Sequence, residues 1–513
     1  MNIKHFAPLA FILFAGSAGA LAQGYQDAAR FGMLMPQGTA RSVGFGSALG
    51  SVGGDFSALS VNPAAIGIYR RGEFSFSPSI HFGNDEFTYF GNKSTDNFSA
   101  FNISNVGVVS VTGARQTSSN SWNSWGFGIG LNRLADFNRS YSYSGRNDSS
   151  AFSETFSLDA NFQGLTPSEL TTYEDAQQSL GNLGYQAWLI DFDSVNNFYY
   201  TLADFRQGPL AQAKTVRERG GINELVFNGG GNYGEKIMVG ATLGLPIVRY
   251  KRELTFGEKD LNGTITDFQE ARYQQQLSTT GVGVNLKLGV IVKPTNAFRF
   301  GAAIHTPTWY TLRDEEDNFL FANTEGSHTN ATHTLLTRTF EYTMRTPWRA
   351  VVSATGFMGN WGFVSADYEF VDYASSRITF NTSENQLIYN GTRLAAQQQL
   401  ANDSLKANLE SASNFRIGGE ARLDFLYLRA GLGFYGSPYK KSNLFGDGMK
   451  SYHAGVGYRG NRGFVDLGFV NTQRSGGEYA YQLPYGGTTG TIAPEARGSI
   501  TTNNIILTFG AKF

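Results

Sequence analysis

The sequence predicts an all-β protein, a transmembrane antiparallel β-barrel of about fourteen strands with an N-terminal lumenal hatch. One observation is the C-terminal segment, in which Ile505, Leu507, Phe509 and Ala511 alternate with small or polar residues before a terminal Phe513. A period of two with a final aromatic is typical of the last strand of an outer-membrane barrel. The others are an N-terminal secretion signal and a regular alternation of short and long connections between candidate strands.

Residues 1–22 have the pattern of a secretory signal peptide. Lys4 and His5 form a basic start, an apolar run covers 6–18, and Ala20-Leu21-Ala22 is a small-x-small cleavage site that makes Gln23 the expected mature N-terminus. The apolar run is too short for a spanning helix. The sequence therefore predicts export, to the outer membrane of a Gram-negative-type bacterium.

Residues 23–72 show no alternation and are rich in Gly, Ser and Ala. A barrel rarely needs about fifty residues before its first strand. Such a segment either extends into the periplasm or folds back into the barrel as a plug, and we predict the second arrangement, a hatch.

Residues 73–513 carry the barrel, and several of its strands alternate cleanly. Ile237, Val239, Ala241, Leu243 and Leu245, for example, share one face. The candidate strands are approximately 73–83, 98–113, 121–135, 219–233, 235–250, 277–293, 296–311, 335–356, 360–379, 411–423, 425–436, 449–460, 462–473 and 500–513.

The connections alternate between short turns and long polar loops, which is the periplasmic and external pattern of such barrels. Within the first long loop, 167–180 is expected to be helical, with Thr166 as N-cap and Glu169 three residues later. The predicted external loops are 136–218, 251–276, 312–334, 380–410, 437–448 and 474–499.

The inward-facing positions of these strands carry charges of both signs. One interpretation is a solvated or salt-bridged lumen; the other is that some of the groups clamp a plug or an anionic ligand head group. Both argue against a wide pore of a single sign. The candidate lumen network consists of Arg299, His305, Asp367, Glu369, Arg416, Glu420 and Arg429.

The third candidate strand places Gly126, Gly128 and Gly130 on the face opposite its large apolar side chains. Glycine weakens a strand and leaves space beside it. The glycines either give a plug room to pack, or they mark a candidate wall opening through which an apolar solute leaves sideways into lipid.

The residues that carry enzyme or cofactor chemistry are missing. Cysteine is absent, the formal net charge of −1 offers no cationic surface for nucleic acid, and Gly229-Gly230-Gly231 is not followed by the lysine of a phosphate loop. His328 and His333 share one loop without a third ligand at usable spacing. We therefore predict no catalytic residues, no metal and no cofactor.

Asn62-Pro63-Ala64, inside the predicted hatch, stands in a sequence that resembles the FadL/TodX family of outer-membrane transporters. Further stretches similar to that family are 299–307, 346–349, 366–373 and 429–438. Each motif alone is weak, and their order along a barrel pattern gives the resemblance its weight. The resemblance implies a hatch that carries Asn62, Pro63 and Ala64 and sits in the lumen.

That resemblance also implies passive uptake of hydrophobic molecules, with long-chain fatty acids expected and aromatic compounds as the other class. The solute would be captured by external loops, held above the hatch and released laterally through the wall near a kinked third strand. We expect a monomer in outer-membrane lipid, inserted by the barrel-assembly machinery through Phe513. The alternatives are a general polar-solute porin and a structural or adhesive barrel.

Overall fold

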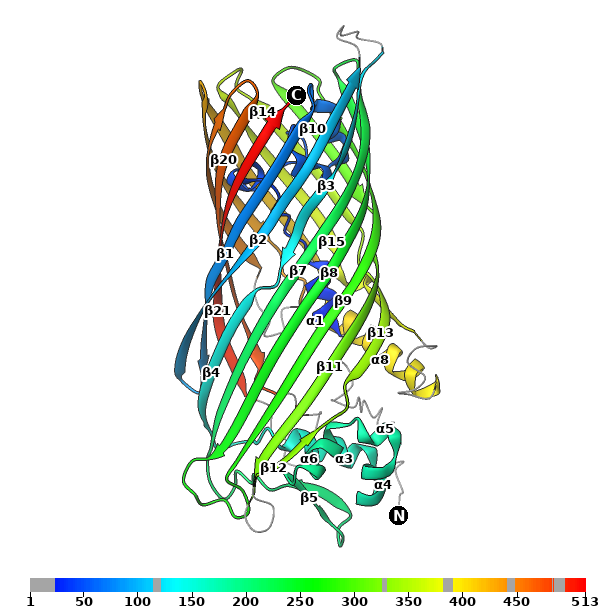
Figure 1. The fold of residues 1–513 in the computed structure, drawn as a ribbon, viewed down its shortest axis with the longest axis vertical. Helices are drawn as coiled ribbons and strands as arrows, with labels where there is room; N and C mark the ends of the chain where they lie inside the picture. The colour runs from blue at the N-terminus through cyan, green and yellow to red at the C-terminus, as the bar shows by residue number, and fades with distance from the viewer. Residues whose placement is uncertain are drawn as a thin grey trace, which may run out of the picture.

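The computed structural model of the chain is a closed antiparallel barrel that is much taller than it is wide (Figure 1). It describes residues 24–113, 121–324, 330–381, 391–440, 448–481, 483 and 494–513. The predicted signal peptide, 1–22, lies outside the described residues. Strand β21 pairs with β1 over most of its length and closes the barrel.

The barrel sheet contains 19 strand segments. They are β1 (Glu73–Tyr89), β2 (Asn92–Gly113), β3 (Trp122–Asp136), β4 (Arg139–Asn147), β7 (Leu210–Tyr233), β8 (Ile237–Asp260), β9 (Glu270–Val292), β10 (Phe298–His305), β11 (Trp309–Asn323), β12 (Ala331–Thr334), β13 (Arg338–Arg345), β14 (Arg349–Phe357), β15 (Gly362–Asp372), β16 (Arg377–Phe380), β17 (Ser411–Leu423), β18 (Leu426–Tyr435), β19 (Met449–Arg459), β20 (Gly463–Tyr479) and β21 (Glu495–Lys512).

Some wall strands are divided into two or more consecutive segments, so the 19 segments make 14 wall strands, as the sequence predicted. Segments β10 and β11 both pair with β9 and are separated at Pro307; β14 and β13 are separated at Pro347. Proline has no backbone N–H to give to the ladder, so each wall strand is interrupted there. Segments β3 and β4 both pair with β7 and are separated by Phe137 and Asn138.

The outward face of the barrel is apolar only in the half that carries the short turns. On β8 the outward residues are apolar from Ile237 to Ile247, and from Arg249 onward they are polar or charged. Ten residue steps in a strand tilted by about 40° span roughly 25 Å along the barrel axis, which is the height of the apolar band of a membrane barrel. We call this band the apolar belt.

The strands continue beyond the belt and into segments predicted as loops. Strand β7 begins at Leu210, β8 runs to Asp260 and β9 begins at Glu270, so the predicted loops 136–218 and 251–276 shorten to 148–209 and 261–269. The predicted loops 312–334 and 474–499 likewise contain parts of β11, β20 and β21. Outside the belt the outward residues of β8 are no longer apolar, so the apolar outer face that reveals a strand in sequence ends while the hydrogen-bonded ladder continues.

A small helical subdomain stands at the loop end of the barrel (Figure 1). It contains α3 (Glu154–Gln163), α4 (Pro167–Thr172), α5 (Glu174–Gln177), α6 (Leu180–Gln186) and the hairpin β5 (Ile190–Asp193) and β6 (Phe198–Thr201). The predicted N-cap is confirmed, because Thr166 and Glu169 form a reciprocal capping box, although α4 ends at Thr172. Phe156, Leu170 and Leu183 belong to its buried core.

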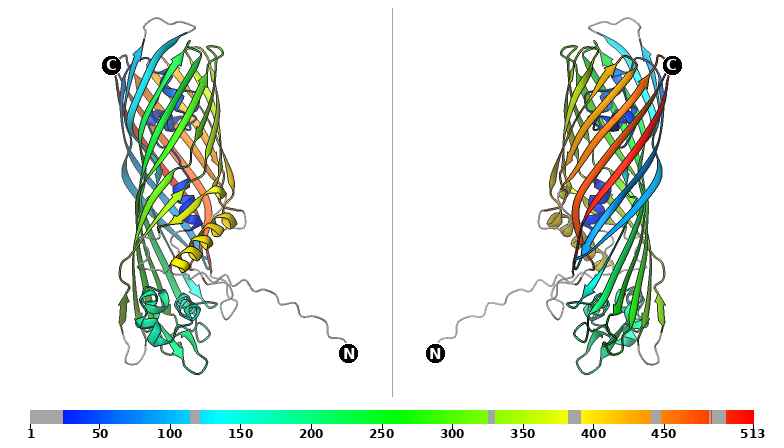
Figure 2. Two further views of the ribbon diagram at one scale, coloured as in Figure 1. Left: turned by 90° about the vertical axis from the view of Figure 1, so that its right-hand side faces the viewer. Right: turned by 90° about the vertical axis from the view of Figure 1, so that its left-hand side faces the viewer.

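A longer helix, α8 (Gly391–Asn408), occupies part of the predicted loop 380–410 (Figure 2). Its buried residues Leu394, Ala401 and Leu405 share a cluster with Phe31 and Ile378, which come from the inside of the barrel and from β16. Among the described residues, no helix combines the length and the hydropathy needed to cross a bilayer.

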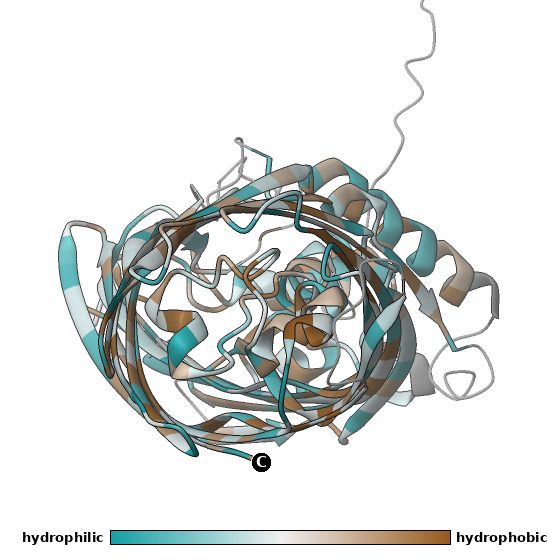
Figure 3. Ribbon diagram, turned by 90° about the horizontal axis from the view of Figure 1, so that it is seen from above, coloured by the Kyte–Doolittle hydropathy of each residue, from teal (hydrophilic) through white to brown (hydrophobic). Residues whose placement is uncertain are grey.

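Residues 24–72 lie inside the barrel, and we call them the inner segment (Figure 3). The segment contains α1 (Tyr25–Gly32), α2 (Ala40–Gly44) and the 3-10 turns η1 (Phe56–Ser60) and η2 (Pro63–Ile68). It starts in the loop-end half with α1, fills the turn-end half, and leads into β1 at Glu73 (Figure 1). Phe45, Leu49, Phe56 and Leu59 are almost completely buried between it and the wall.

Candidate functional site

The inner segment is fastened to strands all round the wall by hydrogen bonds to its backbone. The side chains of His305, Arg299 and Thr242 bind the carbonyl oxygens of Val61, Val52 and Leu59 at 2.8, 2.6 and 2.8 Å. These wall residues come from β10 and β8. Further contacts of this kind come from Asn228, Asn232 and His453, which bond to Pro63, Gly67 and Val43.

Asn62-Pro63-Ala64 forms the innermost corner of this segment. Asn62 is completely buried; its Nδ2 donates to the carbonyl oxygens of Gly50 at 2.6 Å and Val290 at 3.2 Å. Its Oδ1 accepts from the backbone N–H of Ala64 at 3.1 Å and so caps η2, in which Pro63 takes the first position. Proline suits that position because its N–H would be unsatisfied there anyway. One side chain therefore joins two parts of the inner segment to β9.

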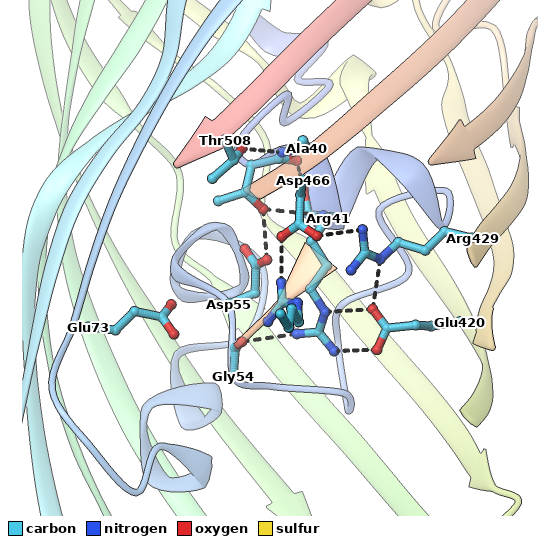
Figure 4. A network of polar contacts seen from close by, with 12 residues as sticks. Ala40, Arg41, Gly54, Asp55, Glu73, Glu420, Arg429, Asp466 and Thr508 are labelled. Carbon is cyan, nitrogen blue, oxygen red and sulfur yellow. Dashed lines mark hydrogen bonds and ion pairs between the residues drawn. The ribbon is translucent and has the colours of Figure 1, made fainter. Parts of the chain in front are cut away.

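A buried ion-pair network joins α2 to strands β17, β18 and β20 (Figure 4). The guanidinium of Arg41 contacts Glu420 at 2.9 Å and the carbonyl oxygen of Gly54 at 2.9 Å. Glu420 also binds Arg429 at 2.7 Å, and Arg429 reaches Asp466 at 2.8 Å. Opposite charges in a confined lumen pair to offset the cost of desolvation.

All seven residues of the predicted lumen network point inward. Three bind backbone groups of the inner segment, namely Arg299, His305 and Asp367, whose carboxylate accepts the N–H of Gly50 at 3.0 Å. Glu420 binds Arg41, as described above. The others pair within the wall: Glu369 binds Arg416 at 3.2 Å, and Arg429 binds Glu420. The network thus contacts the inner segment rather than free lumen.

The three glycines of β3 also face the inner segment. A Cβ at Gly126 would overlap Ile66, at Gly128 it would lie 2.9 Å from Leu59, and at Gly130 it would overlap Val106 and come 2.5 Å from Phe56. At these positions β3 is hydrogen-bonded to β2 on one edge and to β7 on the other. Of the two interpretations of the glycines, the geometry agrees with packing space, and no gap in the pairing occurs beside them.

The loop-end half of the lumen holds a cavity of about 570 Å³. Tyr25 and Arg30 of α1 border it on one side, and Phe152 and Leu180 of the helical subdomain border it on the other. Aromatic side chains from the wall surround it: Tyr141, Tyr250, Phe256, Tyr273, Tyr435 and Tyr479. The cavity is several times the roughly 150 Å³ that encloses one benzene molecule.

The charged groups of this cavity are mostly paired. Arg139 binds Asp85 at 2.5 Å, and Lys214 binds Glu478 at 2.8 Å. Two further arginines line the cavity, Arg252 and Arg474, and neither forms an ion pair with a carboxylate of the described residues. Arg252 donates to Gln275 at 2.5 Å, and its Nε is buried without a partner among the described residues. The cavity thus combines aromatic walls with two cationic groups that have no direct carboxylate contact among the described residues; Glu218 acts on both of them from beyond ion-pair distance.

A seam interrupts the wall beside the cavity. Strand β2 pairs with β3 only from Asn105 to Gly113, and no described residue of its other part, 92–104, pairs through the backbone with β4. Side chains bridge the seam instead: Asn102 binds Asp136 at 2.7 Å, and Asp96 accepts from the backbone N–H of Ser142 at 2.6 Å.

The seam has a different environment on each side. On the outside, Ile80 and Phe101 are 51% and 70% exposed and extend the apolar surface up to it. On the inside, the cavity touches Asp136. The inner segment reaches the seam as well, because Met35 and Gln37 donate their backbone N–H groups to the carbonyl oxygens of Leu134 and Arg133 on β3, at 2.8 and 3.0 Å.

Sequence reasoning missed the seam as well as Arg252 and Arg474. The seam depends on which backbone edges pair in the folded barrel. The two arginines lie in segments that were predicted to be loops. Among the described residues, no group of three or more His, Asp or Glu side chains is arranged to hold a metal ion. His328, considered above with His333, lies outside the described residues.

No family model and no curated protein matches the chain. Among solved structures, the toluene transporter TodX of P. putida is similar, with a TM-score of 0.51 and 14% sequence identity over 93% of this chain and 98% of TodX. A structure named TodX monoaromatic hydrocarbon channel deltaS2 mutant gives a TM-score of 0.50 and 13% identity over 93% of this chain and 98% of that one. At such identities the likeness concerns the fold, and the FadL/TodX resemblance is confirmed at that level.

Proposed function

We propose that this protein is an outer-membrane transporter for the passive uptake of hydrophobic and amphiphilic small molecules, with no catalytic role. The observation that carries the proposal is the cavity, which is blocked toward the turn end by the inner segment and borders an unpaired seam in the wall. A solute in the cavity would therefore leave sideways through the seam and not toward the turn end, where the inner segment fills the lumen. The fold shared with the toluene transporter TodX supports the same function.

In this proposal the inner segment is the hatch, residues 23–72, and it does not leave the barrel during transport. Its hydrogen bonds and ion pairs reach β8, β9, β10, β15, β17 and β21. Breaking all of them at once for every solute molecule would cost far more than binding one small molecule returns. A local movement of Met35 and Gln37 is cheaper and would free the edge of β3 at the seam.

The transport route would then have three stages. The loop-end subdomain captures the solute, the aromatic cavity holds it, and the side-chain bridges Asn102–Asp136 and Asp96–Ser142 separate to release it into lipid. Asn92 adds a third bridge to the carbonyl oxygen of Ser144 at 3.3 Å. Three side-chain bridges are weaker than a continuous ladder, since a hydrogen bond to a charged group contributes about 1.5–3 kcal/mol and a neutral one about 1 kcal/mol. Glycines Gly126, Gly128 and Gly130 would act beside the seam by seating the hatch, not as the opening itself.

For the cargo we propose long-chain fatty acids as the leading class and aromatic compounds as the second. Arg252 and Arg474 favour the first class, because an apolar cavity with unpaired guanidinium groups suits a carboxylate attached to an apolar chain. Arg474→Gln is expected to weaken oleate binding by roughly tenfold, the value of one charge-assisted hydrogen bond, and to leave toluene binding unchanged. If the natural protein and the Arg474→Gln variant bind oleate equally well, aromatic compounds become the favoured class of cargo.

The seam route is testable by cross-linking, because the chain has no native cysteine. Asp96→Cys with Ser142→Cys would join β2 to β4 across the seam. Oxidation is expected to lower fatty-acid uptake by proteoliposomes at least tenfold, and reduction should restore it. Val108→Cys with Ile129→Cys, on the paired part of β2 and β3, is the matched control. Unchanged uptake with the seam locked would exclude lateral release.

A polar-solute porin is the rival function, and it makes an opposite prediction. Liposomes that carry a porin swell in small sugars, whereas the buried inner segment leaves no such path in the present protein. The remaining expectations are part of the proposal: 1–22 as signal peptide, monomeric state, and recognition of the exposed Phe513 by the barrel-assembly machinery. The C-terminus is anchored nearby, since the N–H of Phe513 donates to Gly72 at 3.0 Å.

A further inference from the structure

Four basic side chains form a patch on the outside of the barrel, on the adjacent strands β7 and β8. Arg217 and Arg219 of β7 and Arg249 and Lys251 of β8 are exposed, and none of them points into the lumen. The register places Arg219 directly opposite Lys251, and Arg249 opposite Gly221, one outward position away from Arg219. Outward positions so related lie about 5–8 Å apart. The four form the basic patch.

Most of this charge has no counter-ion in the described part of the chain. Glu253 is the one carboxylate beside the patch among the described residues: it approaches Lys251 at 3.5 Å and stands opposite Arg217 in the register. Arg217, Arg219 and Arg249 form no ion pair with a described residue, so one carboxylate faces four cations. Like charges directly opposite each other on a sheet are destabilising. A patch of this composition is more stable when an external anion binds between its members.

The patch begins where the apolar belt ends. Ile247 is the last outward apolar residue of β8, and Arg249 is the next residue on the same face. With the belt in the hydrocarbon core, the patch lies at the depth of the lipid head groups, on the loop side of the membrane. In the proposed placement this is the outer leaflet.

We propose that the basic patch binds the phosphate groups of an outer-leaflet phosphoglycolipid of the lipid A class. Guanidinium groups match phosphate oxygens in bidentate fashion, and several arginines on one rigid sheet hold two phosphates at a fixed separation. The acyl chains of the lipid would cover Leu243 and Ile247 below the patch, which are 43% and 37% exposed. The inference rests on the outer-membrane placement proposed above, but not on the identity of the cargo.

The patch also lies one strand away from the seam. Strand β4 separates them, and its Ser140 pairs with Arg217. A lipid bound at the patch would therefore flank the proposed exit and keep the outer-leaflet packing regular beside it.

Native mass spectrometry of the full chain in detergent tests the proposal, with hexa-acylated diphosphoryl lipid A as the probe. The variant Arg217→Ser, Arg219→Ser, Arg249→Ser is expected to bind this lipid roughly 100-fold more weakly, since each basic residue near a lipid surface contributes roughly fivefold. Monophosphoryl lipid A should bind the natural protein more weakly than the diphosphoryl form. The matched control, Lys259→Ser with Arg272→Ser, removes two outward cations far from the belt and should bind normally.

Three results would overturn the proposal: equal lipid A binding by the triple variant, equal loss in the control, or equal affinity for phosphatidylglycerol. The corresponding triple lysine variant keeps the charge without the guanidinium fork, and intermediate binding by it would support the bidentate contact. A folded barrel is verified by its heat-modifiable migration on gels. If the protein takes up no cargo but still binds lipid A, only the proposed function is contradicted. If it takes up cargo but does not bind lipid A, only the present inference is contradicted.

Discussion

The lumen is filled in one half of the barrel and holds a cavity in the other. In the turn-end half, the inner segment fills the interior, and wall glycines such as Gly240 and Gly418 admit its backbone so closely that a Cβ would overlap it. In the loop-end half, large aromatic side chains line a cavity of about 570 Å³, and the wall itself has a seam. One half is built to remain closed, and the other has room for a ligand and a weak edge.

This difference shows that buried charge serves two purposes in one lumen. Around Arg41 and Glu420 the guanidinium and carboxylate groups form direct ion pairs that fasten the inner segment to the wall. Around Arg252 and Arg474 the described residues supply no carboxylate within ion-pair distance, and in the proposed function this leaves both groups accessible to a ligand. The same residue types therefore hold the inner segment in one half and line the cavity in the other.

Deletion of residues 24–72 should have the largest effect, because it removes the difference between the halves. The lumen of a 14-strand barrel would then be continuous, and planar bilayers with the truncated protein should show stable ion-conducting channels that the full chain does not form. Trimming the helical subdomain, 151–203, is the control, since it leaves the inner segment in place. A truncated barrel that conducts no better than the full chain would show that the segment is not the plug.

Breaking the Arg41–Glu420 pair should have the next largest effect. Removing one member leaves a buried charge without its partner, which costs about 3–5 kcal/mol. Arg41→Ala and Glu420→Ala are each expected to lower the urea midpoint of the barrel in detergent. The double variant should recover part of the loss if the pair is direct, and strictly additive losses would exclude coupling.

The sequence predicted the closed fold because the relevant signal is local. Alternation from Ile237 to Leu245 identifies a strand by itself, and so does the C-terminal segment that ends in Phe513. The inward charges were also visible, since the residues opposite an apolar outer face must point inward. The ends of β7 and β8 were missed, because beyond the belt their outward residues no longer form an apolar face.

The seam and the function of the β3 glycines could not be predicted for a different reason. Gly126 has the same sequence signature whether it relieves crowding by Ile66 or opens the wall, and only the register of β2 against β3 and β4 decides between them. Likewise, Arg474 gives no indication in sequence that it lacks a carboxylate neighbour. Properties of this kind depend on contacts between residues hundreds of positions apart.

Filling one wall glycine should produce a smaller effect than breaking the ion pair. A Cβ at Gly418 would overlap the carbonyl oxygen of Phe45, so Gly418→Ala forces the inner segment away from β17 at a cost of about 1–3 kcal/mol. Gly229→Ala is the matched control, because its Cβ would make an ordinary contact with Phe127 at 3.7 Å. Thermal unfolding and brief conductance bursts would report the change, and equal behaviour of both variants would mean that the segment does not depend on close packing.

The smallest expected effect lies outside the membrane, in the capping box of α4. The backbone N–H of Thr166 donates to the Glu169 carboxylate at 2.9 Å and lowers the pKa of Glu169 below its ordinary value of 4.5. Because the folded pKa is the lower one, the stabilisation is fully present above the unfolded pKa and is lost as the pH falls through the folded value. Hydrogen exchange at the amides of Leu170 and Tyr173, corrected for the intrinsic pH dependence, should therefore speed up below pH 4.5. Glu169→Gln keeps a capping side chain but cannot titrate, so its protection should not change over that range; the same acid response in both proteins would place the titrating group elsewhere.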